Sequence, residues 1–114
     1  MRYLLLIYAD EQGQTSELRQ NCYQESRQLI QELKTQGVFR DAAPLQPVAL
    51  ATSVRLRDSK KMITDGPFAE THEQLGGFFM IDVPDLDDAI KIASQIPAAR
   101  WGTIEIRPVK ELSI

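Results

Sequence analysis

Tyr3-Leu-Leu-Leu-Ile-Tyr8 is an unbroken apolar run near the start of a 114-residue chain. The run is rich in strand-forming residues and has no polar face, so it predicts a strand that is covered on both sides. Helices of the same chain can cover one side of a sheet. The other side then needs a different cover, and a second copy of the chain in a twofold-symmetric homodimer is the simplest one.

Two segments with helical periodicity supply the first cover. One begins at Thr15 or Ser16, either of which can cap a helix, and runs to about Gln36, with Gly37 as its stop. The other is capped by Asp85 and runs to about residue 96, before Pro97. Each carries one apolar stripe: Leu18, Cys22, Leu29, Ile30 and Leu33 in the first, and Leu86, Ala89, Ile90, Ala93 and Ile96 in the second.

The remaining apolar segments predict strands. Val48–Leu56 alternates between apolar and small or polar residues, and Lys61–Thr64 returns as its hairpin partner after a turn at residues 57–60. Later strands are expected at Gly77–Val83 and Thr103–Val109, whereas residues 38–47, with two prolines, are expected to be a connection. The order predicts one α+β domain over residues 1–114: a ferredoxin-like sandwich, with an antiparallel sheet and two helices on one face.

Composition narrows the class of protein. Hydrophobic residues make up 43% of the chain and charged residues 25%, which is ordinary for a soluble domain. The net charge of −3 and the scattered basic residues argue against a nucleic-acid partner. No apolar run approaches the roughly 20 residues of a membrane span, so we expect a cytoplasmic protein with no membrane contact. Cys22 is the single cysteine and lies on an apolar stripe, where we expect a buried hydrophobe.

The segment from Met62 to Asp82 concentrates glycine, proline and acidic residues around the single histidine. Asp65-Gly-Pro-Phe68 predicts a tight turn, because Gly66 can adopt a positive φ and Pro67 fixes its own. Asp65 is expected to accept backbone hydrogen bonds in this turn, and Phe68 to anchor it in the core. Gly76 and Gly77 allow a backbone to approach closely, either a neighbouring strand or a ligand.

Asp65 and His72 are the candidate catalytic residues of this segment. The unperturbed pKa of histidine suits a general base, and Glu70 and Glu73 lie close enough in sequence to orient His72. The alternatives are that Asp65 only holds the turn and that His72 is a solvated loop residue. Thr71 and Gln74 have the spacing of a capping box and predict a single helical turn. One histidine with dispersed carboxylates falls short of a metal signature, so we expect no metal and no cofactor.

Arg100 and Trp101 precede the last expected strand and can form an anion-binding or aromatic platform at the mouth of a cleft. The alternative is a helix-exit loop with a half-buried tryptophan. We expect a ligand cleft lined by six residues: Tyr8, Asp65, Phe68, Glu70, Arg100 and Trp101.

The sequence resembles the DGPF family, a branch of the YCII-related proteins. The resemblance rests on Tyr3–Tyr8, Thr64-Asp-Gly-Pro-Phe-Ala-Glu-Thr71 and Glu73-Gln-Leu-Gly-Gly-Phe78, and on residues 81–87, 96–100 and 104–109. It implies a ferredoxin-like fold of the dimeric α/β-barrel superfamily. Relatives use a histidine of the first helix with a nearby aspartate as a candidate catalytic pair, but the first helix here has no histidine. At the position of His72, relatives more often have lysine.

The resemblance also implies a partner, because relatives occur beside, or fused to, alternative sigma factors. Three functions are consistent with these features. The first is a small homodimeric protein that binds a small-molecule ligand and is linked to sigma-factor-dependent transcription. The second is a cofactor-free enzyme that moves a proton on a small organic acid or lactone, as isomerases and lyases do. The third is a protein-interaction module whose bare sheet face binds a sigma-type partner.

Overall fold

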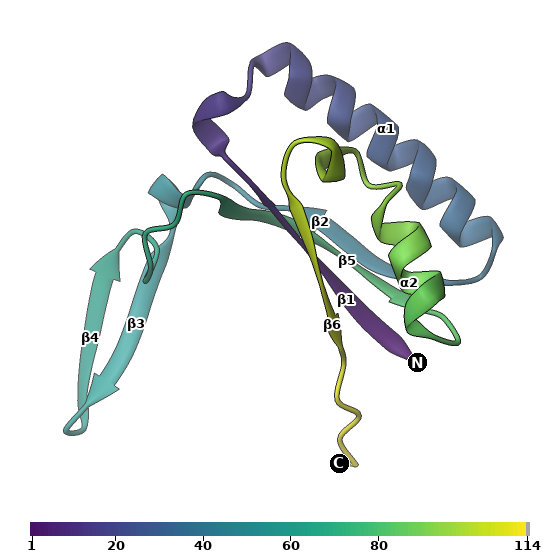
Figure 1. Ribbon diagram of the computed structural model, residues 1–114. Helices are drawn as coiled ribbons and strands as arrows, with labels where there is room; N and C mark the ends of the chain where they lie inside the picture. The colour runs from purple at the N-terminus through teal and green to yellow at the C-terminus, as the bar shows by residue number, and fades with distance from the viewer. Residues whose placement is uncertain (114) are drawn as a thin grey trace.

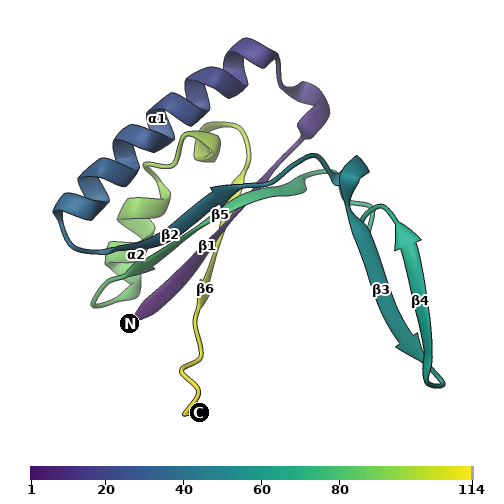
Figure 2. The ribbon, with the colours of Figure 1, turned by 180° about the vertical axis from the view of Figure 1, so that it is seen from behind.

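A four-stranded antiparallel sheet forms the centre of the molecule, which the computed structural model describes over residues 1–113 (Figure 1). The strands lie in the order β2 (Phe39–Pro44), β5 (Gln74–Asp82), β1 (Arg2–Ala9), β6 (Thr103–Pro108). Two helices, α1 (Ser16–Thr35) and α2 (Leu86–Ala93), cover one face of this sheet, as Figures 1 and 2 show from opposite sides. The predicted ferredoxin-like α+β sandwich is therefore confirmed.

The helices begin where their capping residues predict. The Thr15 side chain accepts a hydrogen bond from the Leu18 N–H at 3.1 Å, and the Asp85 carboxylate accepts one from the Asp88 N–H at 3.0 Å. Gly37 follows α1 with a φ of 77°, a conformation that suits glycine. Helix α2 ends earlier than predicted, because Pro97 keeps the residue before it extended and begins a short 3₁₀ helix, η3 (Pro97–Arg100).

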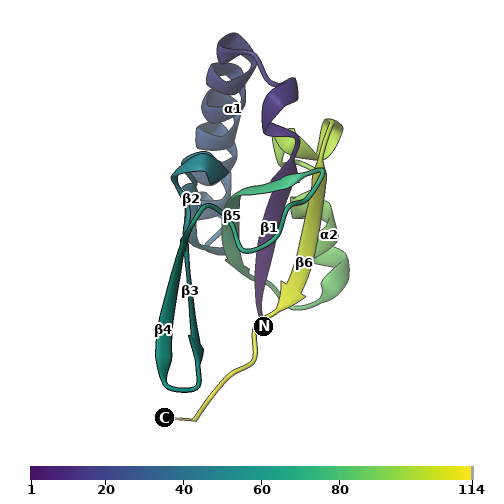
Figure 3. The ribbon, with the colours of Figure 1, turned by 90° about the vertical axis from the view of Figure 1, so that its left-hand side faces the viewer.

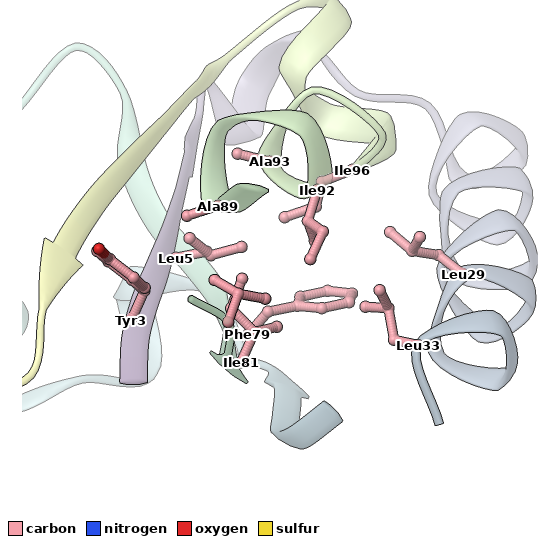
Figure 4. Packing of buried hydrophobic residues seen from close by; sticks show 11 residues of the cluster. Tyr3, Leu5, Leu29, Leu33, Phe79, Ile81, Ala89, Ile92, Ala93 and Ile96 are labelled. Atoms are coloured by element: carbon pink, nitrogen blue, oxygen red, sulfur yellow. The ribbon is translucent and has the colours of Figure 1, made fainter. Parts of the chain in front are cut away.

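The hydrophobic core lies between the sheet and the two helices. Leu5 of β1 and Ile81 of β5 are completely buried, and Phe79 points from β5 towards the α1 leucines Leu29 and Leu33 (Figure 4). The alternate residues of β1 and β5 point to the opposite face of the sheet. This second face, called the open face below, carries half-exposed apolar side chains at its centre: Leu4, Leu6, Tyr8, Phe78 and Met80.

The hairpin stands apart from the sheet. Strands β3 (Thr52–Arg57) and β4 (Lys60–Asp65) form a separate two-stranded sheet, called the arm, which projects on the side opposite the helices (Figures 1 and 2). Figure 3 shows the arm beside the β2 edge of the sheet and away from β6. The predicted turn is present, with positive φ at Asp58 and Ser59.

Two sequence predictions about this region were wrong. Residues 48–50 form a short 3₁₀ helix, η2, instead of the start of the strand, because the chain turns there to leave the body. The expected connection at residues 38–47 contains β2, an edge strand that gains its order by pairing with β5. Pro44 is tolerated there because it ends an edge strand.

The loop after the arm also differs from expectation. Gly66 has the predicted positive φ of 101°, but Phe68 is 77% exposed and lies against Arg55 of the arm, 5.7 Å from its guanidinium carbon to the ring centroid. Phe68 does not pack in the core because the arm projects away from the core. Within residues 1–113 the Asp65 carboxylate accepts no hydrogen bond. The expected helical turn at Thr71 is absent because Gln74 belongs to β5.

Candidate functional site

A groove with a volume of about 680 Å³ lies between α1 and the helix side of the sheet. This volume falls within the roughly 300–1,000 Å³ typical of small-molecule sites. Strands β1 and β5 provide the floor, α1 provides one wall, and β2 with the residues after it provides the other. Residues 96–98 and Trp101, in the segment that leads into β6, lie at its edge.

The floor is apolar and built from small residues. Ile7 and Phe79 contribute apolar surface, while Ala9, Ala42 and Gly77 leave space above the sheet. A Cβ at Gly77 would approach the Ala43 carbonyl oxygen to 2.9 Å, so the glycine lets β2 pair closely with β5. The close approach at Gly77 is that of the neighbouring strand, and the same glycine also lines the groove.

Two rows of α1 side chains form the helical wall. Arg19, Tyr23 and Arg27 are four residues apart and therefore share one side of the helix. The adjacent row is Cys22, Ser26 and Ile30. Arg19 donates from Nη2 to the Glu11 carbonyl oxygen at 3.4 Å. Neither arginine forms an ion pair with any other residue in the part of the chain that the structure describes.

Cys22 is half-buried and lines the groove, so the prediction of a buried core position was wrong. The row of Cys22, Ser26 and Ile30 lies over the gap that the small floor residues leave, and not over the core. Burial raises the pKa of the Cys22 thiol, and the nearby Glu25 carboxylate raises it further. The thiol is therefore protonated at neutral pH, which makes it a poor nucleophile.

Gln74 closes one end of the groove. Its Oε1 accepts a hydrogen bond from the Glu11 N–H at 3.0 Å, and its Nε2 donates to the Thr71 carbonyl oxygen at 2.7 Å. The Glu11 carboxylate in turn accepts from the Val48 N–H at 3.1 Å. These bonds join the turn after β1, the start of η2 and the start of β5, and they direct the Glu11 carboxylate towards the Val48 N–H.

Trp101 and Arg100 lie together at the groove edge. The Arg100 guanidinium carbon is 5.2 Å from the centroid of the Trp101 ring, and Arg100 Nη2 donates to Glu25 Oε2 of α1 at 2.6 Å. Trp101 lines the groove, whereas Arg100 reaches over the ring towards α1. Of the two expected forms of this platform, anion-binding or aromatic, the structure has the aromatic one, with Arg100 stacked on the Trp101 ring.

The other expected site residues lie elsewhere. Tyr8 points to the open face, because its neighbours Ile7 and Ala9 face the groove. Asp65, at the end of the arm, and Phe68, Glu70 and His72, in the loop after it, are exposed and do not line the groove. The structure therefore joins Arg100 with Trp101 and separates both from the Asp65–His72 segment. Sequence reasoning missed Arg19 and Arg27, whose signal is their spacing beside the apolar stripe of α1.

The YCII-related domain matches residues 1–113 of the chain. The chain belongs to the YCII-related family. A protein of Rhizobium meliloti (strain 1021), described as "Uncharacterized protein R00369", is 33% identical over an alignment 114 positions long, which covers 96% of this chain and 92% of the relative.

This YCII-related chain also shares its fold with a solved enzyme structure. The 5-chloro-2-hydroxyhydroquinone dehydrochlorinase from Burkholderia phenoliruptrix AC1100, in complex with 2,5-dihydroxybenzoquinone, superposes with a TM-score of 0.59 at 15% identity. The superposition covers 96% of this chain and 94% of the enzyme. At this identity the likeness shows the fold alone.

Residues 1–113 contain no cluster of three or more histidine, cysteine or acidic side chains arranged to hold a metal ion. Within the same residues, no helix has the length and apolar character needed to cross a membrane.

Proposed function

We propose that this YCII-related protein binds a small, largely apolar molecule in the groove between α1 and the sheet. The observation that carries the proposal is the groove itself, because an apolar floor of this size next to a polar helical wall is the usual form of a small-molecule site. The bound 2,5-dihydroxybenzoquinone of the dehydrochlorinase, a single ring, supports a small ligand by analogy of fold.

A cofactor-free enzyme is the second candidate, because the dehydrochlorinase shares the fold. Proton transfer needs a group that is free to act as a base within reach of the ligand. Besides the two arginines, the titratable side chains that line the groove are Glu11, Cys22 and Tyr23; the Glu11 carboxylate accepts a hydrogen bond from the Val48 N–H, and the Cys22 thiol is protonated. The candidate catalytic residues Asp65 and His72 lie outside the groove. The position of both candidate catalytic residues outside the groove favours binding over catalysis.

Filling the groove from α1 tests the proposal. Ser26 faces the groove, whereas Gln28 is exposed and does not line it. Ser26→Trp should abolish the binding of the neutral probe 4-isopropylbenzamide, followed by amide chemical-shift changes in NMR spectra. Gln28→Trp, the matched control, should bind as the wild type does. Unchanged binding to a folded Ser26→Trp protein, or shift changes confined to the arm, would contradict the proposal.

We also propose that a second copy of the chain covers the open face. The partly exposed apolar centre of this face and the exposed Val54, Leu56 and Ile63 of the arm are apolar surfaces that a second copy can cover. The arm has four basic and two acidic residues and therefore a net charge of +2. Because the whole chain has a net charge of −3, the rest of the chain has a net charge of −5. This asymmetry favours an arm that lies against the body of its partner.

Sedimentation tests this homodimer. Leu6→Glu places a charge at the centre of the open face and should convert a dimer into a monomer. Ile90→Glu, at an exposed apolar position of α2, serves as the control and should leave the dimer intact. A wild-type protein that sediments as a monomer would show that the open face has another role.

A further inference from the structure

The groove has an uneven charge that its apolar floor does not explain. Arg19 and Arg27 line it with one acidic side chain, Glu11, in a chain whose net charge is −3. The Glu11 carboxylate is directed to the Val48 N–H, so it does not neutralise either guanidinium through an ion pair. The helical wall therefore presents two cations to the groove.

We infer that the ligand of the groove is an organic anion: an apolar ring, of the size of a single benzene ring with a small substituent, that bears a carboxylate. The inference rests on the proposed binding function of the groove and specifies its ligand class. Arginine presents several N–H donors in a planar fork that matches a carboxylate, and this pairing is stronger where water is partly excluded. Arg19, which is half-buried beside the apolar floor, meets that condition.

The positions of the two arginines fit a single ligand. Arg19 and Arg27 are eight residues apart, or about 12 Å along the helix axis at 1.5 Å per residue. Tyr23 lies between them in the same row, and both arginine side chains are long and flexible enough to converge over it. A carboxylate near this row leaves its ring against Ile7, Ile30 and Phe79, which are the apolar groups of the floor and wall.

Trp101 at the edge completes the match. Its indole ring lines the groove and is held by Arg100, so a planar ring that enters the groove can pack against a fixed aromatic surface. Arg100 itself is paired with Glu25 and does not add a third free cation. Specificity for the anion is therefore assigned to Arg19 and Arg27, and affinity for the ring to the floor and Trp101.

The test compares two probes of the same shape, 4-isopropylbenzoate and 4-isopropylbenzamide, and follows the fluorescence of Trp101, the single tryptophan of the chain. The wild type should bind the benzoate at least about tenfold more tightly than the benzamide, as expected for a charge-assisted hydrogen bond. Arg19→Gln and Arg27→Gln should each remove most of this preference, because they weaken the binding of the benzoate much more than that of the benzamide. Arg57→Gln, which changes an exposed arginine of the arm, should preserve the preference.

The outcomes separate this inference from the binding function on which it rests. Equal affinity of the wild type for the two probes would overturn the inference that the ligand is an anion, and the groove would then be a site for a neutral ligand. The same holds if the preference for benzoate survives both arginine substitutions. No response of Trp101 to either probe would overturn the binding function together with the inference. Arg27 is exposed, so Arg27→Gln gives a valid test even if Arg19→Gln lowers the yield of folded protein.

Discussion

Arg100 lies over the ring of Trp101 and is tied to Glu25, so a residue of η3 connects the groove edge to α1. The contact spans 75 residues of sequence between Glu25 and Arg100. It restrains a ring that is 36% exposed with Arg100 in place. A fixed aromatic surface loses less conformational entropy when a ligand packs against it, so this arrangement should increase affinity.

Arg100→Gln should release Trp101 and weaken the binding of 4-isopropylbenzoate several-fold. The protein itself should lose less than about 1 kcal/mol of stability, because the Arg100–Glu25 pair is exposed to solvent. Trp101 emission should shift to longer wavelength as the ring becomes more solvated. Glu25→Gln should have the same effect in weaker form, and an unchanged emission spectrum in both variants would show that the contact does not hold the ring.

Asp65→Asn and His72→Lys should leave binding in the groove unchanged to within about twofold, because both residues are exposed and do not line it. Titration of Trp101 fluorescence with 4-isopropylbenzoate checks this result. A loss of binding in either variant, with the fold intact, would move the functional site to the loop after the arm.

Gly102→Ala should destabilise the protein by about 1–3 kcal/mol, because the new Cβ would overlap the Tyr8 carbonyl oxygen and contact Ala9 of β1. This prediction concerns the backbone at the start of β6. Gly13→Ala is the matched control, since no atom outside its neighbours lies within 4 Å of that Cβ, and it should change stability by less than about 0.5 kcal/mol. Urea unfolding monitored by circular dichroism measures both, and equal midpoints would contradict the overlap.

Glu111 gives the stability of the protein a defined acid dependence. The Arg2 guanidinium donates to both Glu111 carboxylate oxygens, at 2.9 and 2.7 Å, and these hydrogen bonds lower the pKa of that carboxyl. A lowered pKa in the folded state means that the pair stabilises the fold above the unfolded value of about 4.3. That contribution is lost as the pH falls through the lower folded value.

Glu111→Gln should therefore be less stable than the wild type near neutral pH, and the difference should shrink below about pH 4. Thermal unfolding as a function of pH measures the two curves. Glu70→Gln, which changes an exposed glutamate without an ion pair in residues 1–113, should run parallel to the wild type. A constant difference between wild type and Glu111→Gln across this range would argue against the pairing.

Local patterns predicted most elements but not the position of the arm. The alternation of Val54 and Leu56 correctly indicated a strand, yet alternation states only that one face is apolar, and not what that face contacts. In the structure, the side chains of Val54 and Leu56 are exposed to solvent. Strand β2 was missed for the opposite reason, since Phe39–Pro44 has no strong pattern and is ordered by its pairing with β5.

The groove was hidden from sequence reasoning by a similar limit. The row of Arg19, Tyr23 and Arg27 can be read from helical spacing, but whether it faces solvent or a groove depends on the separation of α1 from the sheet. The groove in front of that row is lined by small residues on strands that are distant in sequence, Ala9, Ala42 and Gly77. By contrast, Trp101 was found because an aromatic residue beside an arginine at a strand entrance carries its own signal.

The structure of the protein crystallised with 4-isopropylbenzoate would test the central claim most directly. The claim predicts the ring in the groove, between α1 and the sheet, with the carboxylate within hydrogen-bond distance of Arg19 or Arg27 and the ring near Trp101. A benzoate bound instead at the open face or beside Asp65 and His72, with the groove empty, would contradict it.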